Sequence, residues 1–158
     1  MAPIESSITV PTSVDDIFAF LSKCESHLKF IPRMVELQQT SSGEFGQVGT
    51  TAKGTLNYFG VRIPVEYEVI GYHPNQQLAM NGVMGPVRFR DGYILCAKAG
   101  GTEITFWLEL HPTGWTKILS PFAGLIGKIH AWETLRNLKR ELNNIEEIAS
   151  SSHRSSSQ

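Results

Sequence analysis

The sequence has only two cysteines, Cys24 and Cys96, which lie far apart and have no CxxC neighbour or nearby histidine. Neither a disulfide framework nor a cysteine-based zinc site is indicated, so a reducing, cytoplasmic setting is expected. The sequence also lacks a run of about 18 apolar residues that could span a bilayer, and it lacks the N-terminal pattern of a signal peptide. We therefore expect a soluble chain without stable membrane insertion.

Net charge is lacking as well, because 14 basic and 15 acidic residues leave a formal charge of −1. This balance gives no electrostatic footprint for nucleic acid or for an anionic membrane surface. His27, His73 and His111 show no metal-ligand spacing, so no metal is expected. The glycines at 43, 46 and 49 lack the GK[ST] ending and the following helix of a phosphate loop, and no cofactor is expected.

What is present fits one domain with a real core, since 158 residues are too few to expect two. Residues 150–158 are mostly serine and offer little apolar area to offset the entropy of ordering. We therefore predict a domain over 1–149 and a disordered polar tail over 150–158.

The chain begins with a predicted strand over 4–10, which Pro11 ends. Ser13 is placed to cap a helix, with Asp16 three residues later, and Val14, Ile17, Phe18 and Leu21 then share one helical face. A second short helix is predicted over 25–30, because the residue before Pro32 is disfavoured in helical conformation. These two helices would form one wall of the domain.

The middle of the chain alternates with period two, which is typical of half-buried strands. Residues 61–69 and 104–110 show it most clearly, and Gly100-Gly101 supplies the turn of a hairpin whose first arm is 87–98. Further strands are predicted over 35–40, 49–56 and 78–83. With the first strand, these make about seven strands of a curved antiparallel sheet.

The last predicted helix starts near Ser120-Pro121 and runs to about residue 148. Its apolar face (Leu135, Leu138, Leu142, Ile145) continues backwards through Ala131, Gly127 and Gly124. A second apolar set points the opposite way and consists of Leu125, Ile126, Ile129 and Trp132. The helix must change its buried side, kink, or expose this set. We predict a homodimer contact or a lid, with a membrane-contacting patch and burial within the monomer as the alternatives.

This order of elements belongs to an α+β fold in which a sheet wraps around a helix and leaves a hollow between them. The chain resembles the SRPBCC or START-like superfamily over nearly its whole length. The similar segments are residues 10–18, 30–32, 47–50, 101–105 and 135–139. The resemblance implies a helix-grip fold with an internal apolar cavity, but no particular reaction, because members range from carriers to polyketide cyclases and dehydrases.

Asp91 is the main candidate for chemistry. If the strand over 87–98 keeps its alternation, Phe89, Asp91 and Tyr93 face the hollow, where a desolvated carboxyl can act as a general acid or base. Tyr93 and Tyr67 would be its hydrogen-bonding partners. The alternatives are a bulge or turn at Asp91-Gly92 and the opposite phase, in which Arg88 and Arg90 face inward. His130 is interpreted as a surface or packed histidine, because no partner is identifiable.

The sequence therefore predicts a container for a small hydrophobic or aromatic molecule, such as a polyketide-like compound, a sterol or a lipid. The predicted lining of the container is Tyr67, Met80, Met84, Phe89, Tyr93, Phe106, Gly124, Gly127 and Ala131. For each of these residues, a place in the ordinary hydrophobic core is an equally good interpretation. The alternatives are a cyclase or dehydratase acting on an enolisable ligand through Asp91, and a protein-interaction module that uses the last helix.

Overall fold

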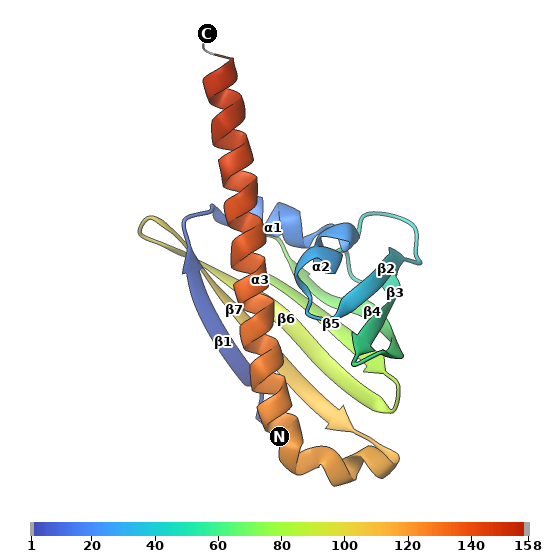
Figure 1. Ribbon diagram of the computed structural model, residues 1–158. Helices are drawn as coiled ribbons and strands as arrows, with labels where there is room; N and C mark the ends of the chain where they lie inside the picture. The colour runs from blue at the N-terminus through green and yellow to red at the C-terminus, as the bar shows by residue number, and fades with distance from the viewer. Residues whose placement is uncertain (1, 157–158) are drawn as a thin grey trace.

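The computed structural model describes residues 2–156 and contains one antiparallel sheet with a long helix across it (Figure 1). The strand order is β1-β7-β6-β5-β4-β3-β2. The strands are β1 (Ile4–Val10), β2 (Met34–Gln39), β3 (Thr51–Tyr58), β4 (Val61–His73), β5 (Gln77–Met84), β6 (Val87–Lys98) and β7 (Gly101–Pro112). The helices are α1 (Val14–Leu21), α2 (Cys24–Phe30), the 3₁₀ helix η1 (Gly114–Leu119) and α3 (Ser120–Ser155). The predicted α+β helix-grip fold with seven strands is confirmed.

The first helix begins where its capping residues predict. The backbone N–H of Asp16 donates to the Ser13 hydroxyl at 3.2 Å, and that hydroxyl donates to the Asp16 carboxylate at 2.9 Å. This pair satisfies a backbone donor that has no partner within the helix. Ile17 and Leu21 are then buried against the core. Together with α2, this helix covers one end of the sheet (Figure 1).

The strands alternate as the sequence predicts. In β4, Val65, Tyr67 and Val69 are buried while Glu66 and Glu68 are exposed. The turn before β4 contains Gly60 at φ 87°, a left-handed conformation that glycine adopts without a Cβ clash. One face of the sheet is thus apolar and faces α3, and the other carries charged side chains.

The last helix crosses the apolar face of the sheet and packs mainly on β1, β7 and α2. Leu135, Leu138 and Leu142 are buried there. Ser120 was expected to cap this helix, but its φ of −51° and ψ of −38° are already helical. The preceding 3₁₀ helix supplies the reason, because its final turn runs directly into α3 and leaves no extended cap position.

The structure differs from the expected disorder at the start of the serine-rich tail, because α3 continues to Ser155. Extending an existing helix fixes only one residue for each new hydrogen bond. The hydroxyls of Ser150 and Ser151 also donate to the carbonyls of Glu147 and Ile148, both at 2.9 Å. The last two residues of the predicted tail, 157–158, lie outside the described residues.

Both cysteines are free thiols, with Cys24 buried and Cys96 exposed. Within residues 2–156, no helix combines the length and the apolar character needed to cross a membrane. In the same part of the chain, His, Cys, Asp and Glu side chains form no group that could hold a metal ion.

Candidate functional site

A small cavity lies between the first half of α3 and the apolar face of the sheet. Its volume is about 70 Å³. It is bordered by Leu56, Tyr58, Tyr67, Met84, Phe89, Asp91, Leu108, Leu110, Ile126, Gly127 and His130. The central hollow predicted from the sequence is therefore largely filled by side chains, since drug-sized ligands occupy about 300–1,000 Å³.

Asp91 is the polar group at the floor of this cavity. It is 6% exposed, and its Oδ1 has no hydrogen-bond partner within residues 2–156. The pairing of β6 with β5 and β7 continues without a shift at Asp91 and Gly92, so the bulge alternative is wrong. Burial raises the pKa of Asp91 from 3.8 to about 7. A neutral carboxyl here can donate a proton near neutral pH, and its conjugate base can accept one.

His130 reaches the same cavity from α3. It is partly buried, and desolvation, followed by repulsion from Arg33, lowers its pKa to about 4. The imidazole is thus neutral over the range in which Asp91 titrates. The structure brings one weak acid and one neutral base to the same apolar space, an arrangement that suits proton transfer. The interpretation of His130 as merely packed or exposed missed this placement, because the other residues of the cavity come from strands far away in the sequence.

Tyr67, Met84 and Phe89 border the cavity as predicted. Tyr67 and Phe89 meet edge to face, with ring centroids 5.4 Å apart. Desolvation, followed by the nearby Asp91 carboxylate, raises the pKa of Tyr67 well above 10.0, so its hydroxyl stays protonated. It is therefore a hydrogen-bond donor or acceptor and not an acid at neutral pH.

Tyr93, Phe106 and Met80 lie elsewhere in the core. Tyr93 packs between the ring of Phe30, at 6.1 Å, and that of Phe106, at 5.2 Å. Met80 borders a second space of only about 10 Å³ beside His27. These three side chains are buried, with α2 residues beside Tyr93 and Met80 and the rings of Tyr93 and His130 beside Phe106, and none of the three borders the cavity.

The small residues of α3 behave differently from one another. Gly127 borders the cavity, and a Cβ added to it would collide with Cδ1 of Ile4. Ala131 is fully buried but does not border the cavity, and a Cβ on Gly124 would meet nothing within 4 Å. The sequence pattern gave all three the same direction, but Gly127 lies against Ile4, the first residue of β1, whereas Gly124, one turn earlier, has no neighbour there.

Six residues at the cavity were absent from the predicted lining: Leu56, Tyr58, Leu108, Leu110, Ile126 and His130. Leu108 and Leu110 carry the same alternation as Phe106 and were available from that pattern. Tyr58 sits at the end of β3, where the Arg33 guanidinium lies 5.2 Å from its ring centroid. Arg33 also donates to the Glu133 carboxylate of α3 at 2.7 Å, which ties β3 to the helix beside the cavity.

The second apolar set of α3 is exposed, and one member, Ile126, also borders the cavity. Leu125, Ile126, Ile129 and Trp132 are 62%, 53%, 47% and 56% exposed. The prediction that one straight helix cannot bury both sets against the sheet is confirmed, and burial within the monomer is wrong. The homodimer through these four side chains stays a prediction.

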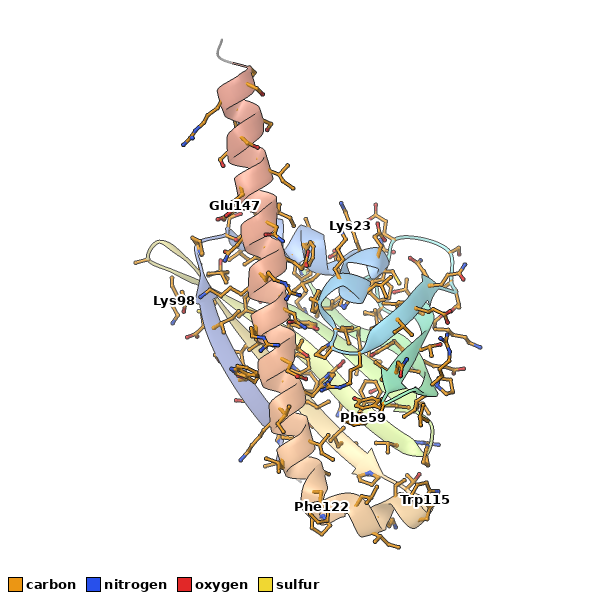
Figure 2. All side chains as sticks on the ribbon, viewed as in Figure 1. Lys23, Phe59, Lys98, Trp115, Phe122 and Glu147 are labelled. Atoms are coloured by element: carbon orange, nitrogen blue, oxygen red, sulfur yellow. The ribbon has the colours of Figure 1, made fainter. Side chains whose placement is uncertain are left out.

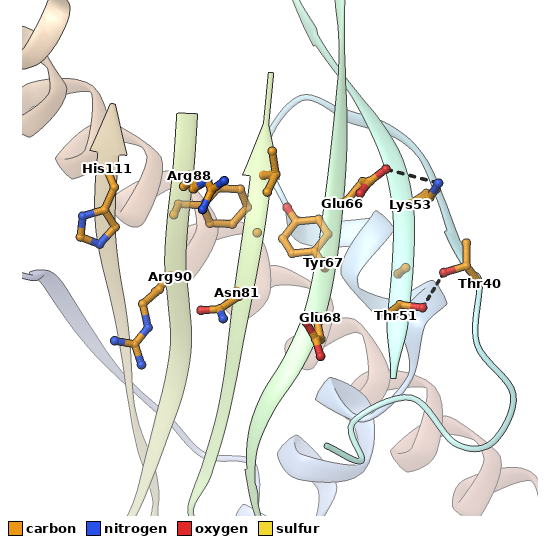
Figure 3. A pocket seen from close by; sticks show the side chains of 14 residues that line it. Thr40, Thr51, Lys53, Glu66, Tyr67, Glu68, Asn81, Arg88, Arg90 and His111 are labelled. Carbon is orange, nitrogen blue, oxygen red and sulfur yellow. Dashed lines mark hydrogen bonds and ion pairs between the residues drawn. The ribbon is translucent and has the colours of Figure 1, made fainter. Parts of the chain in front are cut away.

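A larger hollow of about 560 Å³ lies on the other face of the sheet (Figure 3). Arg88, Arg90 and His111 line one side of it, and Glu66 and Glu68 line the other (Figure 3). The two arginines are exposed, so the alternative phase that turns them inward is wrong. This hollow is bordered by solvated charges, and the apolar cavity is the better candidate for an apolar ligand.

The site is thus a buried, unpartnered carboxyl in an apolar space between a curved sheet and its long helix. Residues 1–146 match the family described as polyketide cyclase / dehydrase and lipid transport. The chain belongs to this family. The match confirms the superfamily that the sequence resembled, and it supports ligand binding as the general role. No curated protein matches the sequence.

Solved structures show the same fold at low sequence identity. A protein from Thermus thermophilus has a TM-score of 0.73 and 11% identity over 91% of this chain and 99% of its own. A conserved protein from Geobacillus kaustophilus has a TM-score of 0.73 and 16% identity over 90% and 96%. DynU16, a putative protein in the dynemicin biosynthetic locus, has a TM-score of 0.61 and 16% identity over 89% of this chain and 47% of its own.

Proposed function

We propose that this protein binds a small apolar or aromatic molecule in the cavity between α3 and the sheet. The observation that carries this proposal is the unpartnered Oδ1 of Asp91 in a space bordered mainly by apolar side chains. A buried polar atom without a partner costs about 1–3 kcal/mol, and a ligand hydroxyl or carbonyl that bonds to it removes this penalty. The ligand is therefore expected to carry one polar group on an apolar body.

The size of the cavity limits the ligand. A volume of about 70 Å³ does not hold a sterol or a long acyl chain, and it favours a compact aromatic ring among the classes suggested by the sequence. Entry requires the side chains at the mouth to move. Tyr58, Met84 and Leu110 are only partly buried, and Ile126 is exposed, so the mouth lies beside these residues. Methionine adapts to irregular shapes with little strain.

A second candidate function is proton transfer on an enolisable ketone, as in a cyclase or dehydratase. Asp91 and His130 favour it, because their shifted pKa values keep one group able to donate and the other able to accept a proton near neutral pH. Tyr67 would orient the ligand oxygen from the opposite strand. Tyr93 has no part in this version, because it does not border the cavity.

Binding is tested with 2-naphthol, a small fluorescent dye that carries one hydroxyl on an aromatic body and whose emission changes when it leaves water. We expect Gly127→Leu to fill the cavity and reduce dye affinity at least ten-fold. Gly124→Leu is the matched control, since its side chain enters open space one turn earlier, and it should bind the dye like the parent protein. Equal dye affinity in the two folded variants would remove this cavity as the binding site.

Proton transfer is tested with β-tetralone in deuterated water, where exchange at the carbon next to the carbonyl is followed by nuclear magnetic resonance. The enzyme version predicts faster exchange with the protein present, and Asp91→Asn should abolish the acceleration while the dye still binds. If the ketone binds but its hydrogen exchange is no faster than in buffer, the enzyme version is wrong and only the binding function stands.

A further inference from the structure

The exposed apolar surface of the molecule is concentrated on η1 and the first half of α3. Its members, here called the apolar ridge, are Trp115, Ile118, Leu119, Phe122, Leu125, Ile126, Ile129 and Trp132, each between 47% and 78% exposed. Trp115 and Phe122 lie together at one end of the molecule, far from Glu147 (Figure 2). A ridge of this size requires an occupant, because monomers seldom expose so many neighbouring large apolar side chains.

The ridge is a continuous stripe on the helix. At about 3.6 residues per turn, Phe122, Leu125, Ile129 and Trp132 fall on one side of α3. Gly127 and Ala131 fall on the opposite side, and both are buried. The stripe therefore points directly away from the sheet, and no segment among residues 2–156 covers it.

The segment that carries the ridge, residues 115–132, has basic but no acidic side chains. The sequence has no Asp or Glu between Glu109 and Glu133, whereas Lys117 and Lys128 lie within that segment. Glu133 is engaged by Arg33 at 2.7 Å, and the guanidinium of Arg136 lies 4.5 Å from the centre of the Trp132 ring. Although the whole chain has a formal charge of −1, the segment that carries the apolar stripe therefore has only basic charged side chains.

We propose that the apolar ridge docks on the surface of an anionic lipid bilayer, with η1 and the first half of α3 lying in the interfacial layer. An apolar helix face bordered by lysines is the pattern of helices that lie in this layer, and tryptophan is enriched at the same depth. Lysines near such a surface are attracted by the negative potential of anionic lipids. The proposal goes beyond ligand binding and does not depend on it.

A second copy of the chain fits the ridge less well. In a two-fold symmetric dimer, the same surface meets itself, so the lysines at the rim would face lysines. The nearest carboxylate, Glu133, is already paired with Arg33. A bilayer that contains phosphatidylserine supplies the missing negative charge as well as the apolar phase.

The second half of α3 sets the limit of the contact. It carries three acidic side chains (Glu141, Glu146, Glu147) and three basic ones (Lys139, Arg140, Arg154), so it adds no net attraction to an anionic surface. Figure 1 shows this half extending beyond the sheet, away from η1. The helix is therefore expected to contact the bilayer with its first half only.

The test is co-flotation of the full-length protein with phosphatidylcholine vesicles, with and without phosphatidylserine. We expect binding to the anionic vesicles and a loss of at least ten-fold in Leu125→Ser/Ile129→Ser. Lys117→Gln/Lys128→Gln should weaken binding to anionic vesicles about five-fold per lysine, with no effect on pure phosphatidylcholine. The matched control is Ile145→Ser/Ile148→Ser, which removes two aliphatic side chains from the second half of α3 and should bind like the parent protein.

Sedimentation of the same proteins without vesicles completes the test. A monomer that floats with anionic vesicles through the ridge supports the proposal. A dimer that Leu125→Ser/Ile129→Ser dissociates, without vesicle binding, overturns it in favour of a second copy. Absence of both vesicle binding and dimerisation also overturns it. Binding of 2-naphthol should stay unchanged in Leu125→Ser/Ile129→Ser, since neither residue borders the cavity. Failure of the docking proposal and failure of the binding proposal are therefore distinguishable.

Discussion

Replacing Asp91 with asparagine tests how much the buried carboxyl changes the free energy of unfolding. Asp91 is 6% exposed, and burial raises its pKa from 3.8 to about 7. Between these two pH values, the folded protein holds a proton that the unfolded chain has lost. The free energy of unfolding therefore falls as the pH rises through this window, because the folded state must then ionise a desolvated carboxyl.

The size of the effect follows from the pKa difference. A shift from 3.8 to about 7 corresponds to about 4 kcal/mol of lost stability above pH 7, at about 1.4 kcal/mol per pH unit. Asp91→Asn keeps the shape of the side chain and cannot ionise. The variant should therefore resemble the parent protein near pH 4 and be more stable than it by up to about 4 kcal/mol near pH 8.

Urea unfolding of both proteins across this pH range measures the difference directly. Contributions from other titrating groups cancel in the comparison, including the two histidines with lowered pKa values. Any constant cost of burying the amide also cancels, because it is the same at every pH. A constant gap between the two stability curves would refute the reasoning, since it would mean that Asp91 is solvated or has a partner in the folded protein.

Two further predictions concern the core. His27 is buried with its Nε2 2.7 Å from the carbonyl oxygen of Leu21, and burial lowers its pKa from 6.5 to about 4. Stability attributable to neutral His27 is lost as the pH falls through this window, by about 3 kcal/mol, so urea unfolding of His27→Leu should vary less with pH than that of the parent protein. Leu135→Ala should cost about 2–5 kcal/mol by urea unfolding, whereas Leu125→Ala should stay within about 0.5 kcal/mol, because the first side chain is 1% exposed and the second 62%. Equal costs for the two leucines would contradict the assignment of the two faces of α3.

The sequence predicted the inward position of Asp91 and the outward position of Leu125 for the same reason. Both follow from local periodicity, which is two residues in a strand and about 3.6 in a helix. A side chain's direction relative to its neighbours is a property of the chain itself. The element order similarly indicated a sheet wrapped around the last helix, and the family resemblance implied the helix-grip fold.

Only the tertiary structure decided which inward side chains border the cavity and how large it is. Tyr93 and Phe89 have the same direction in β6, but α2 covers Tyr93 with Phe30 and leaves Phe89 beside the open space. His130 borders the same cavity as Asp91 because α3 packs across the sheet on β1 and β7. Periodicity fixes the direction of a side chain, whereas the space in front of it depends on elements that are distant in the sequence and pack there.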